Sequence, residues 1–280
     1  MRRHLQGIDH AVILVRDLDK AQKSYARMGF TLTPRGFHTL GSQNHCLMFG
    51  SDYVELLAVP KPHPAMRYFT DFLATGEGLG AIALATDDAG ALYAELAADG
   101  IAADAPLDFS RPVADLGEAR FRIVQLPREV SPGCLMFACQ HFTREFVWRP
   151  EYRGHANGAT QIAAIAVVAE DPESGAASYG RLLGTKAQRI EEGLVVQTGS
   201  APIALTSRWK LGHRLHGVGL PLRVRPLVAA LFIRVADRAR AAEVLRRNGL
   251  QPVQLADGSL AVNAVDAHGV TAEGNAILAT

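Results

Sequence analysis

The chain has 280 residues, with 29 lysines and arginines against 28 aspartates and glutamates, and 48% of its residues are hydrophobic. A net charge of +1 without a run of like charges argues against a nucleic-acid or membrane-surface partner. No stretch approaches the roughly 18 apolar residues of a membrane span. The three cysteines indicate no disulfide framework, so we expect a cytoplasmic protein of one large or two ordinary domains.

A fourfold pattern runs along the chain. An apolar, strand-like run ends in an aspartate, a short amphipathic helix follows, and a glycine ends the helix. Aspartate accepts hydrogen bonds from the free N–H groups of a helix start, and glycine adopts the left-handed conformation that ends one. The aspartates and their glycines are Asp17 and Gly29, Asp87 and Gly100, Asp171 and Gly184, and Asp237 and Gly249.

Short β-like runs follow the first two helices, at residues 30–33, 46–49 and 53–59 and then at 121–126 and 134–139. Each unit therefore has the order βαβββ. We predict an α+β protein of four βαβββ modules, paired into two open-barrel halves. Helices would cover one face of each sheet and leave a concave face for a ligand.

Two segments between modules combine arginine with aromatic residues. Residues 143–156 are predicted to link an N-terminal domain at 1–142 to a C-terminal domain at 157–280, because one short stretch in a neutral protein is weak evidence for nucleic-acid stacking. Residues 209–225 are predicted to form a loop, because their glycines and prolines interrupt an amphipathic helix.

Three segments resemble the vicinal oxygen chelate superfamily, and its glyoxalase-like branch in particular. They lie at residues 7–19, 52–59 and 139–150. The resemblance implies paired βαβββ modules that curl around a small-molecule site. It also implies a metal site with one ligand from the first strand and one from the fourth strand of each of two modules.

Carried over residue by residue, the resemblance assigns His10 and Glu55 as metal ligands and catalytic residues. Strand alternation supports this assignment, since Tyr53 and Glu55 share one face of their strand. Imidazole nitrogen and carboxylate oxygen suit Zn, Ni, Fe or Mn, which would polarise a substrate oxygen. Tyr53 and Trp148 are the predicted substrate-binding residues.

The other modules depart from the superfamily pattern at the ligand positions. In the second module these positions fall at Gly80 or Ala81 and at Met136 or Phe137, none of which binds such a metal well. The third and fourth modules have alanines at the first-strand position and apolar residues near the fourth-strand position, so we predict that they act as scaffold. These residues are Ala164, Ile203–Ala204, Ala230 and Ala276.

Three interpretations of this departure stay open. Other residues could complete the metal site, with His45 and His141 as candidate ligands. His10 and Glu55 could instead act without metal, as a base and its orienting carboxylate. The cavity could also simply bind a ligand, as drug-sequestering members of the superfamily do.

The predicted function is that of a glyoxalase-like enzyme, divalent-metal-dependent, that acts on a small oxygen-bearing metabolite by isomerase, lyase or dioxygenase chemistry. The alternative is a metal-free small-molecule-binding protein of the same fold. Modules of this kind pair through sheets within or between chains, so a homodimer is also considered.

Overall fold

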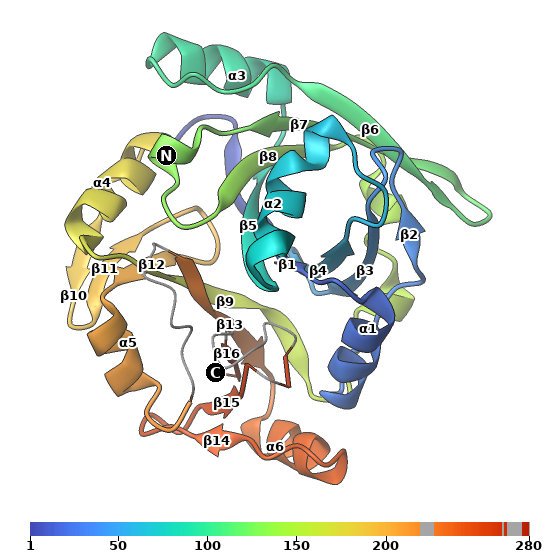
Figure 1. Ribbon diagram of the computed structural model, residues 1–280, viewed down its shortest axis with the longest axis vertical. Coiled ribbons are helices and arrows are strands. Elements are labelled where there is room, and N and C mark those ends of the chain that lie inside the picture. The colour runs from blue at the N-terminus through green and yellow to red at the C-terminus, as the bar shows by residue number, and fades with distance from the viewer. Residues whose placement is uncertain (219–226, 265, 268–275, 280) are drawn as a thin grey trace.

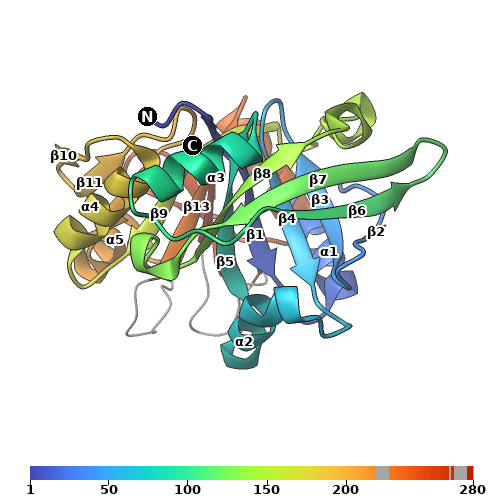
Figure 2. The ribbon, with the colours of Figure 1, turned by 90° about the horizontal axis from the view of Figure 1, so that it is seen from above.

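The computed structural model describes residues 1–218, 227–264, 266–267 and 276–279 (Figure 1). Two eight-stranded sheets lie side by side, the N-terminal one in blue to green and the C-terminal one in yellow to red (Figures 1 and 2). Both sheets have the same order of strands within and between their modules. The predicted α+β architecture of four βαβββ modules in two halves is therefore confirmed.

The N-terminal sheet has the order β2-β3-β4-β1-β5-β8-β7-β6, so its two modules meet where β1 and β5 pair antiparallel. Each of these central strands also pairs in parallel with the last strand of its own module. The elements are β1 (Leu5–Leu14), α1 (Leu18–Arg27), β2 (Gly36–Phe37), β3 (Gln43–Met48), β4 (Tyr53–Ala58), η1 (Pro64–Met66), α2 (Arg67–Thr75), β5 (Gly78–Thr86), α3 (Ala89–Ala98), β6 (Leu107–Val113), β7 (Gly117–Gln125), η2 (Arg128–Val130) and β8 (Leu135–His141).

The C-terminal sheet repeats this order as β10-β11-β12-β9-β13-β16-β15-β14, and two 3-10 turns, η3 (Arg144–Phe146) and η4 (Pro150–Tyr152), precede it. Its modules meet along the antiparallel pair β9 and β13. The elements are β9 (Ala159–Val168), α4 (Pro172–Leu183), β10 (Gln188–Ile190), β11 (Gly193–Val196), β12 (Ile203–Thr206), α5 (Arg208–Arg214), β13 (Leu227–Val235), α6 (Arg238–Arg247), β14 (Val253–Gln254), β15 (Leu260–Val262) and β16 (Ala276–Ala279).

The predicted aspartates and glycines lie at the helix ends, but in the second module the capping aspartate is one residue later than predicted. The side chains of Asp17, Asp171 and Asp237 each accept hydrogen bonds at a helix start, but in the second module Asp88 caps α3. Its neighbour Asp87 instead bonds His4 at 2.9 Å. The four glycines that end these helices have φ values of 90°, 66°, 66° and 75°, the left-handed region in which a side chain is strained.

Four parts of the sequence fold differently from the prediction. Residues 30–33 form no strand, and α2 and β6 were not predicted. The segment predicted as a loop begins with α5, because the Ser207 side chain accepts from the backbone N–H of Lys210 and starts a helical turn. The part of that segment at 219–226 lies outside the described residues.

One apolar core joins the two halves, because the outer faces of β1 and β9 and the helices beside them pack into a single cluster. Tyr179 of α4 is fully buried there, and its hydroxyl donates to the carbonyl of Pro132 at 2.9 Å. The Arg2 guanidinium donates to the Leu182 carbonyl. The domain limits at 142 and 157 stay a prediction, and each half relies on the other for part of its buried surface.

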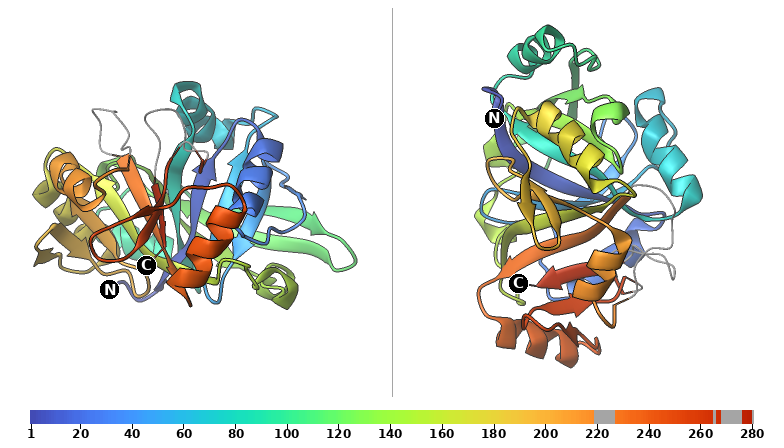
Figure 3. Two further views of the ribbon diagram at one scale, coloured as in Figure 1. Left: turned by 90° about the horizontal axis from the view of Figure 1, so that it is seen from below. Right: turned by 90° about the vertical axis from the view of Figure 1, so that its left-hand side faces the viewer.

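The concave face of the N-terminal sheet carries a second apolar cluster of its own. Met66 and Phe69, from η1 and α2, close one side of it, and α2 lies over this half in Figures 1 and 3. The β6–β7 hairpin extends away from the body of the protein (Figure 2). Among the described residues, no helix is long and apolar enough to cross a membrane.

Candidate functional site

The curved N-terminal sheet encloses a cavity on its concave face. The cavity volume that the centres of water molecules can reach is about 60 Å³, which is room for a few waters or part of a small molecule. Most of the lining consists of leucine, phenylalanine and other apolar side chains. The polar groups that interrupt this lining include His10, His38, Asn44, Glu55 and Arg111. A mainly apolar cavity with a few convergent polar groups is typical of a small-molecule site.

Strand pairing brings His10 and Glu55 together. In the parallel pair of β1 and β4, His10 lies opposite Tyr53 and Val12 lies opposite Glu55, so all four side chains lie on the concave face of the sheet. His10 Nε2 lies 3.5 Å from Glu55 Oε2, and both side chains are buried. The Tyr53 ring stacks on the imidazole with 4.4 Å between centroids, which fixes the plane of the ring.

A bulge in β1 adds Asp9 to this group. The pairing of β1 with β5 shifts register between Ile8 and His10, and the extra residue is Asp9. Simple alternation would place Asp9 on the face opposite His10, but a bulge redirects a side chain. The fully buried Asp9 carboxylate lies 2.7 Å from His10 Nδ1 through its Oδ2 atom. His10 therefore lies between two carboxylates, one at each ring nitrogen.

This arrangement determines what can lie between His10 and Glu55. We assign the Nδ1 proton of His10 to the short bond with Asp9, because a carboxylate can only accept. In the neutral ring, Nε2 then presents a lone pair to Glu55 Oε2 across 3.5 Å. Two acceptors that face each other need a proton or a cation between them. A metal-binding histidine bonded to a carboxylate through its other nitrogen is a common arrangement, and this pair fits it.

Two further side chains approach the Asp9 carboxylate. Its Oδ2 atom also lies 3.0 Å from His141 Nε2 on β8, and Arg144 Nη1 lies 3.7 Å from its Oδ1. Burial acts to raise the pKa of Asp9, but the charges of His141 and His10 and their hydrogen bonds outweigh it, so the pKa lies well below its ordinary value. Asp9 is thus a permanent anion behind His10.

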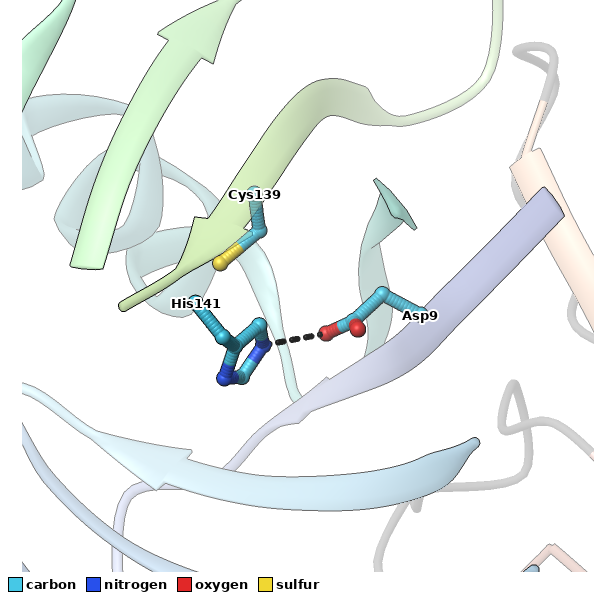
Figure 4. Close-up of side chains that lie close together, drawn as sticks. All are labelled: Asp9, Cys139 and His141. Atoms are coloured by element: carbon cyan, nitrogen blue, oxygen red, sulfur yellow. Dashed lines mark hydrogen bonds and ion pairs between the residues drawn. The ribbon is translucent and has the colours of Figure 1, made fainter. Parts of the chain in front are cut away.

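Cys139 of β8 joins Asp9 and His141 in a second possible metal-binding group. One potential ligand atom from each of the three lies within 4.8 Å of the others, and Figure 4 shows the side chains converging from β1 and β8. Burial, with the charges of Asp9 and Glu55, raises the pKa of the Cys139 thiol well above its usual range. The thiol is therefore protonated, which makes it a poorer ligand than the carboxylates.

The second oxygen of Glu55 is also fixed. Asn44 Nδ2 donates to Glu55 Oε1 at 2.6 Å, so the carboxylate is oriented with Oε2 toward His10. On the same side of the cavity, burial lowers the pKa of His38 to about 4, although Glu55 acts to raise it. His38 is therefore neutral at neutral pH.

The structure brings some of the predicted site residues together and separates others. His10, Glu55 and Tyr53 line the cavity, and His141 reaches the site through Asp9. Trp148 packs edge-on against Tyr53 and His141, behind the lining. His45 points to the opposite face of β3, because its neighbour Cys46 is the residue that pairs with Glu55. Its Nδ1 bonds the Thr33 carbonyl at 2.8 Å, so His45 does not approach the other candidate ligands.

The register also identifies the second-module counterparts of His10 and Glu55. In the parallel pair of β5 and β8, Ala81 lies opposite Leu135 and Ala83 opposite Phe137, as His10 lies opposite Tyr53 and Val12 opposite Glu55. Ala81 thus corresponds to His10 and Phe137 to Glu55. Neither supplies a ligand, so the second module contributes an aromatic and aliphatic wall to the cavity.

A family model described as "Glyoxalase-like domain" matches residues 8–183, well over half of the chain. The chain belongs to the glyoxalase-like domain family. This membership places it in the vicinal oxygen chelate superfamily, as the segments at the start of the chain and at β4 predicted. No curated protein matches the chain.

Several solved structures share the fold of this glyoxalase-like protein over nearly its whole length. A hypothetical protein from Staphylococcus aureus has a TM-score of 0.69 at 12% identity, with 98% of each chain covered. The Mn(II)-bound glyoxalase from Novosphingobium aromaticivorans has a TM-score of 0.60 at 16% identity, over 99% of this chain and 82% of that one. A mutant 4-hydroxymandelate synthase from Streptomyces coelicolor has a TM-score of 0.59 at 14% identity, over 90% and 77%. At these identities the likeness establishes the fold alone.

Proposed function

We propose that this protein is a divalent-metal-dependent enzyme that acts on a small oxygen-bearing molecule in the N-terminal cavity. One observation carries the proposal: His10 Nε2 and Glu55 Oε2 face each other across 3.5 Å, while Asp9 holds the opposite nitrogen of His10. His10 and Glu55 would hold the metal. When bound there, a metal such as Mn or Fe would polarise a substrate carbonyl or enolate oxygen. Isomerase, lyase and dioxygenase chemistry all use such polarisation.

The chain's own residues would set the geometry for that chemistry. Asp9 fixes the tautomer and orientation of His10, and Asn44 does the same for Glu55. Phe137 contributes an apolar wall on the side where a second pair of ligands would otherwise lie. Ala81 and Phe137 leave the remaining coordination positions open to substrate oxygen and water, as a catalytic metal site requires.

A second candidate function rests on the same apolar wall. Because the second module supplies no ligand, the cavity can also act without metal, with a proton between His10 and Glu55. The protein would then be a small-molecule-binding protein, or an acid–base enzyme in which Glu55 orients the imidazole.

Metal content distinguishes the two candidates. Protein purified without chelator and analysed by plasma mass spectrometry should contain about one divalent metal per chain, which a His10→Ala, Glu55→Ala double variant should lose. His45→Gln is the matched control, because it removes a buried histidine from the opposite face of the neighbouring strand and should keep the metal. Full metal content in the double variant would refute these ligands. Wild-type protein that takes up no metal on reconstitution would support the metal-free binding protein.

A further inference from the structure

A buried arginine lines the same cavity as His10 and Glu55. Arg111 of β6 is 9% exposed, and among the described residues that line the cavity it is the one arginine or lysine. Within the described part of the chain, its guanidinium makes neither a hydrogen bond nor an ion pair with a side chain or carbonyl. Arg2, the other buried arginine among the described residues, does find such partners, in the Leu182 carbonyl and Asp99.

The chain makes room for this side chain at Gly36. A Cβ at position 36 would overlap Asn44 Oδ1 and lie 3.2 Å from Arg111 Cδ and 3.4 Å from its Nη1. The backbone at Gly36 is not in the left-handed region, so space rather than conformation explains the glycine. Gly36 thus lets Arg111 and Asn44 lie next to each other at the cavity wall.

A buried guanidinium without a partner is costly. Desolvation disfavours the ion, and a guanidinium keeps its charge in a protein interior. Glu55 forms no ion pair with it, because the Glu55 oxygens are directed to Asn44 and His10. His38 on the same side is neutral at neutral pH. A bound ligand can therefore supply the anionic partner that Arg111 lacks.

We propose that Arg111 binds the carboxylate of the substrate, so that the cavity takes a small organic acid with an apolar body. The inference rests on the proposed function in one respect, the substrate oxygen that the metal at His10 and Glu55 would bind. Binding of a carboxylate by Arg111 does not depend on that metal. A guanidinium matches a carboxylate through two parallel N–H···O bonds. The stacked rings of Phe109 and Phe121, 4.9 Å apart, provide an apolar surface on the same wall for the rest of the molecule.

The single arginine favours a monoanion over a phosphate. A dianionic phosphate would leave one charge uncompensated in an apolar cavity that already holds Glu55. A single guanidinium can form both N–H···O bonds to a carboxylate, and Arg111 provides that guanidinium. Inorganic phosphate therefore serves as the competing anion in the test.

The test compares benzoate with its neutral isostere benzamide by isothermal titration calorimetry on the full-length protein. Benzoate should bind at least about 10-fold more tightly than benzamide, as expected for a charge-assisted pair in place of a neutral one. Arg111→Gln should reduce that preference to less than about 2-fold, and Arg111→Lys should keep part of it as a point charge. Inorganic phosphate should not displace benzoate at equal concentration.

The outcomes separate this inference from the metal site. A benzoate preference that persists in the His10→Ala, Glu55→Ala variant and disappears in Arg111→Gln supports the arginine subsite even if no metal is bound. A preference that is equal in wild type and Arg111→Gln overturns it, as does the absence of any preference in wild type. Since Arg111 is unpaired, Arg111→Gln should melt at or above the wild-type temperature, so its loss of binding would not reflect unfolding.

Discussion

The two halves of the molecule share one strand order but differ in the chemistry of their concave faces. The first module supplies His10 and Glu55, whereas the third has Ala164 and Ala204 at the corresponding register positions. The fourth module has Ala230 and Leu278 there, so the fourth-strand counterpart is Leu278 rather than the predicted Ala276. Leu211 of α5 and Leu215, the residue that follows this helix, pack into the concave cluster of the C-terminal half.

Topology and chemistry are therefore separable in this protein. Four modules build the same sheet because strand pairing, aspartate caps and glycine ends recur in each of them. The polar residues that line the cavity come mainly from the first module, with Arg111 and Gln125 added from the second. A fold of this kind can carry a site in one module while the others act as support.

The largest expected effect concerns the core that the halves share. Tyr179→Ala should destabilise the protein by about 3–5 kcal/mol, because it opens a cavity in that core and removes the bond to Pro132. Trp209→Ala is the control, since Trp209 is 75% exposed and its loss should cost less than about 0.5 kcal/mol. Denaturant unfolding monitored by circular dichroism measures both.

Unfolding in a single transition is expected for Tyr179→Ala as for wild type. Two separated transitions, with the N-terminal half as stable as before, would contradict a shared core and favour independent domains.

A smaller effect is expected from the bulge that distinguishes the first module. Asp9→Asn should weaken metal binding about 10–100-fold without abolishing it, because Asp9 orients His10 rather than contacting the cavity. Competition with a fluorescent chelator measures the change in affinity. Asp99→Asn, at an exposed partner of Arg2, is the matched control and should bind metal as wild type does. Unchanged affinity in Asp9→Asn would show that His10 needs no carboxylate behind it.

The sequence predicted the repeated fold well because its signals are local. Aspartate caps and helix-ending glycines act within one turn, and they mark all four modules. Residues 30–33, by contrast, have a β-like composition but form no strand, since such a composition does not decide which segments join a sheet. The helix α5 was missed because the capping bond from Ser207 outweighed the glycine within the segment.

The site was predictable where strand alternation holds and not where it fails. Alternation correctly places Tyr53 and Glu55 on one face, and the same rule applied to β3 would have excluded His45 in favour of Asn44 and Cys46. Asp9 depends on a bulge, which changes the face of a residue and leaves no mark in the sequence. Arg111 lies on the edge strand β6, about 100 residues from His10, and only the closed curvature of the sheet brings it to the cavity.

The smallest change in stability is expected at a polar contact between the halves. Asp52 accepts from the backbone N–H of Ile162 at 2.9 Å, and burial raises its pKa from 3.8 to about 6. Because the folded pKa lies above the unfolded one, stability that is present below about pH 4 is lost as the pH rises through 6. Asp52→Asn keeps an acceptor and should raise stability at pH 7 by about 1–2 kcal/mol.

Urea unfolding at pH 4 and pH 7 checks this sign. The gain from Asp52→Asn should be present at pH 7 and nearly absent at pH 4. An equal gain at both values would show that the ionisation of Asp52 carries no cost in the folded protein.

The central claim is that a metal in this protein lies between His10 and Glu55 in the N-terminal cavity. Crystals grown with Mn²⁺ and measured at the manganese absorption edge give the most direct test. One strong anomalous peak per chain is expected at roughly 2.0–2.2 Å from His10 Nε2 and from a Glu55 oxygen, distances usual for nitrogen and oxygen ligands. A peak held instead by Asp9, Cys139 and His141, or a peak that touches neither His10 nor Glu55, would contradict it.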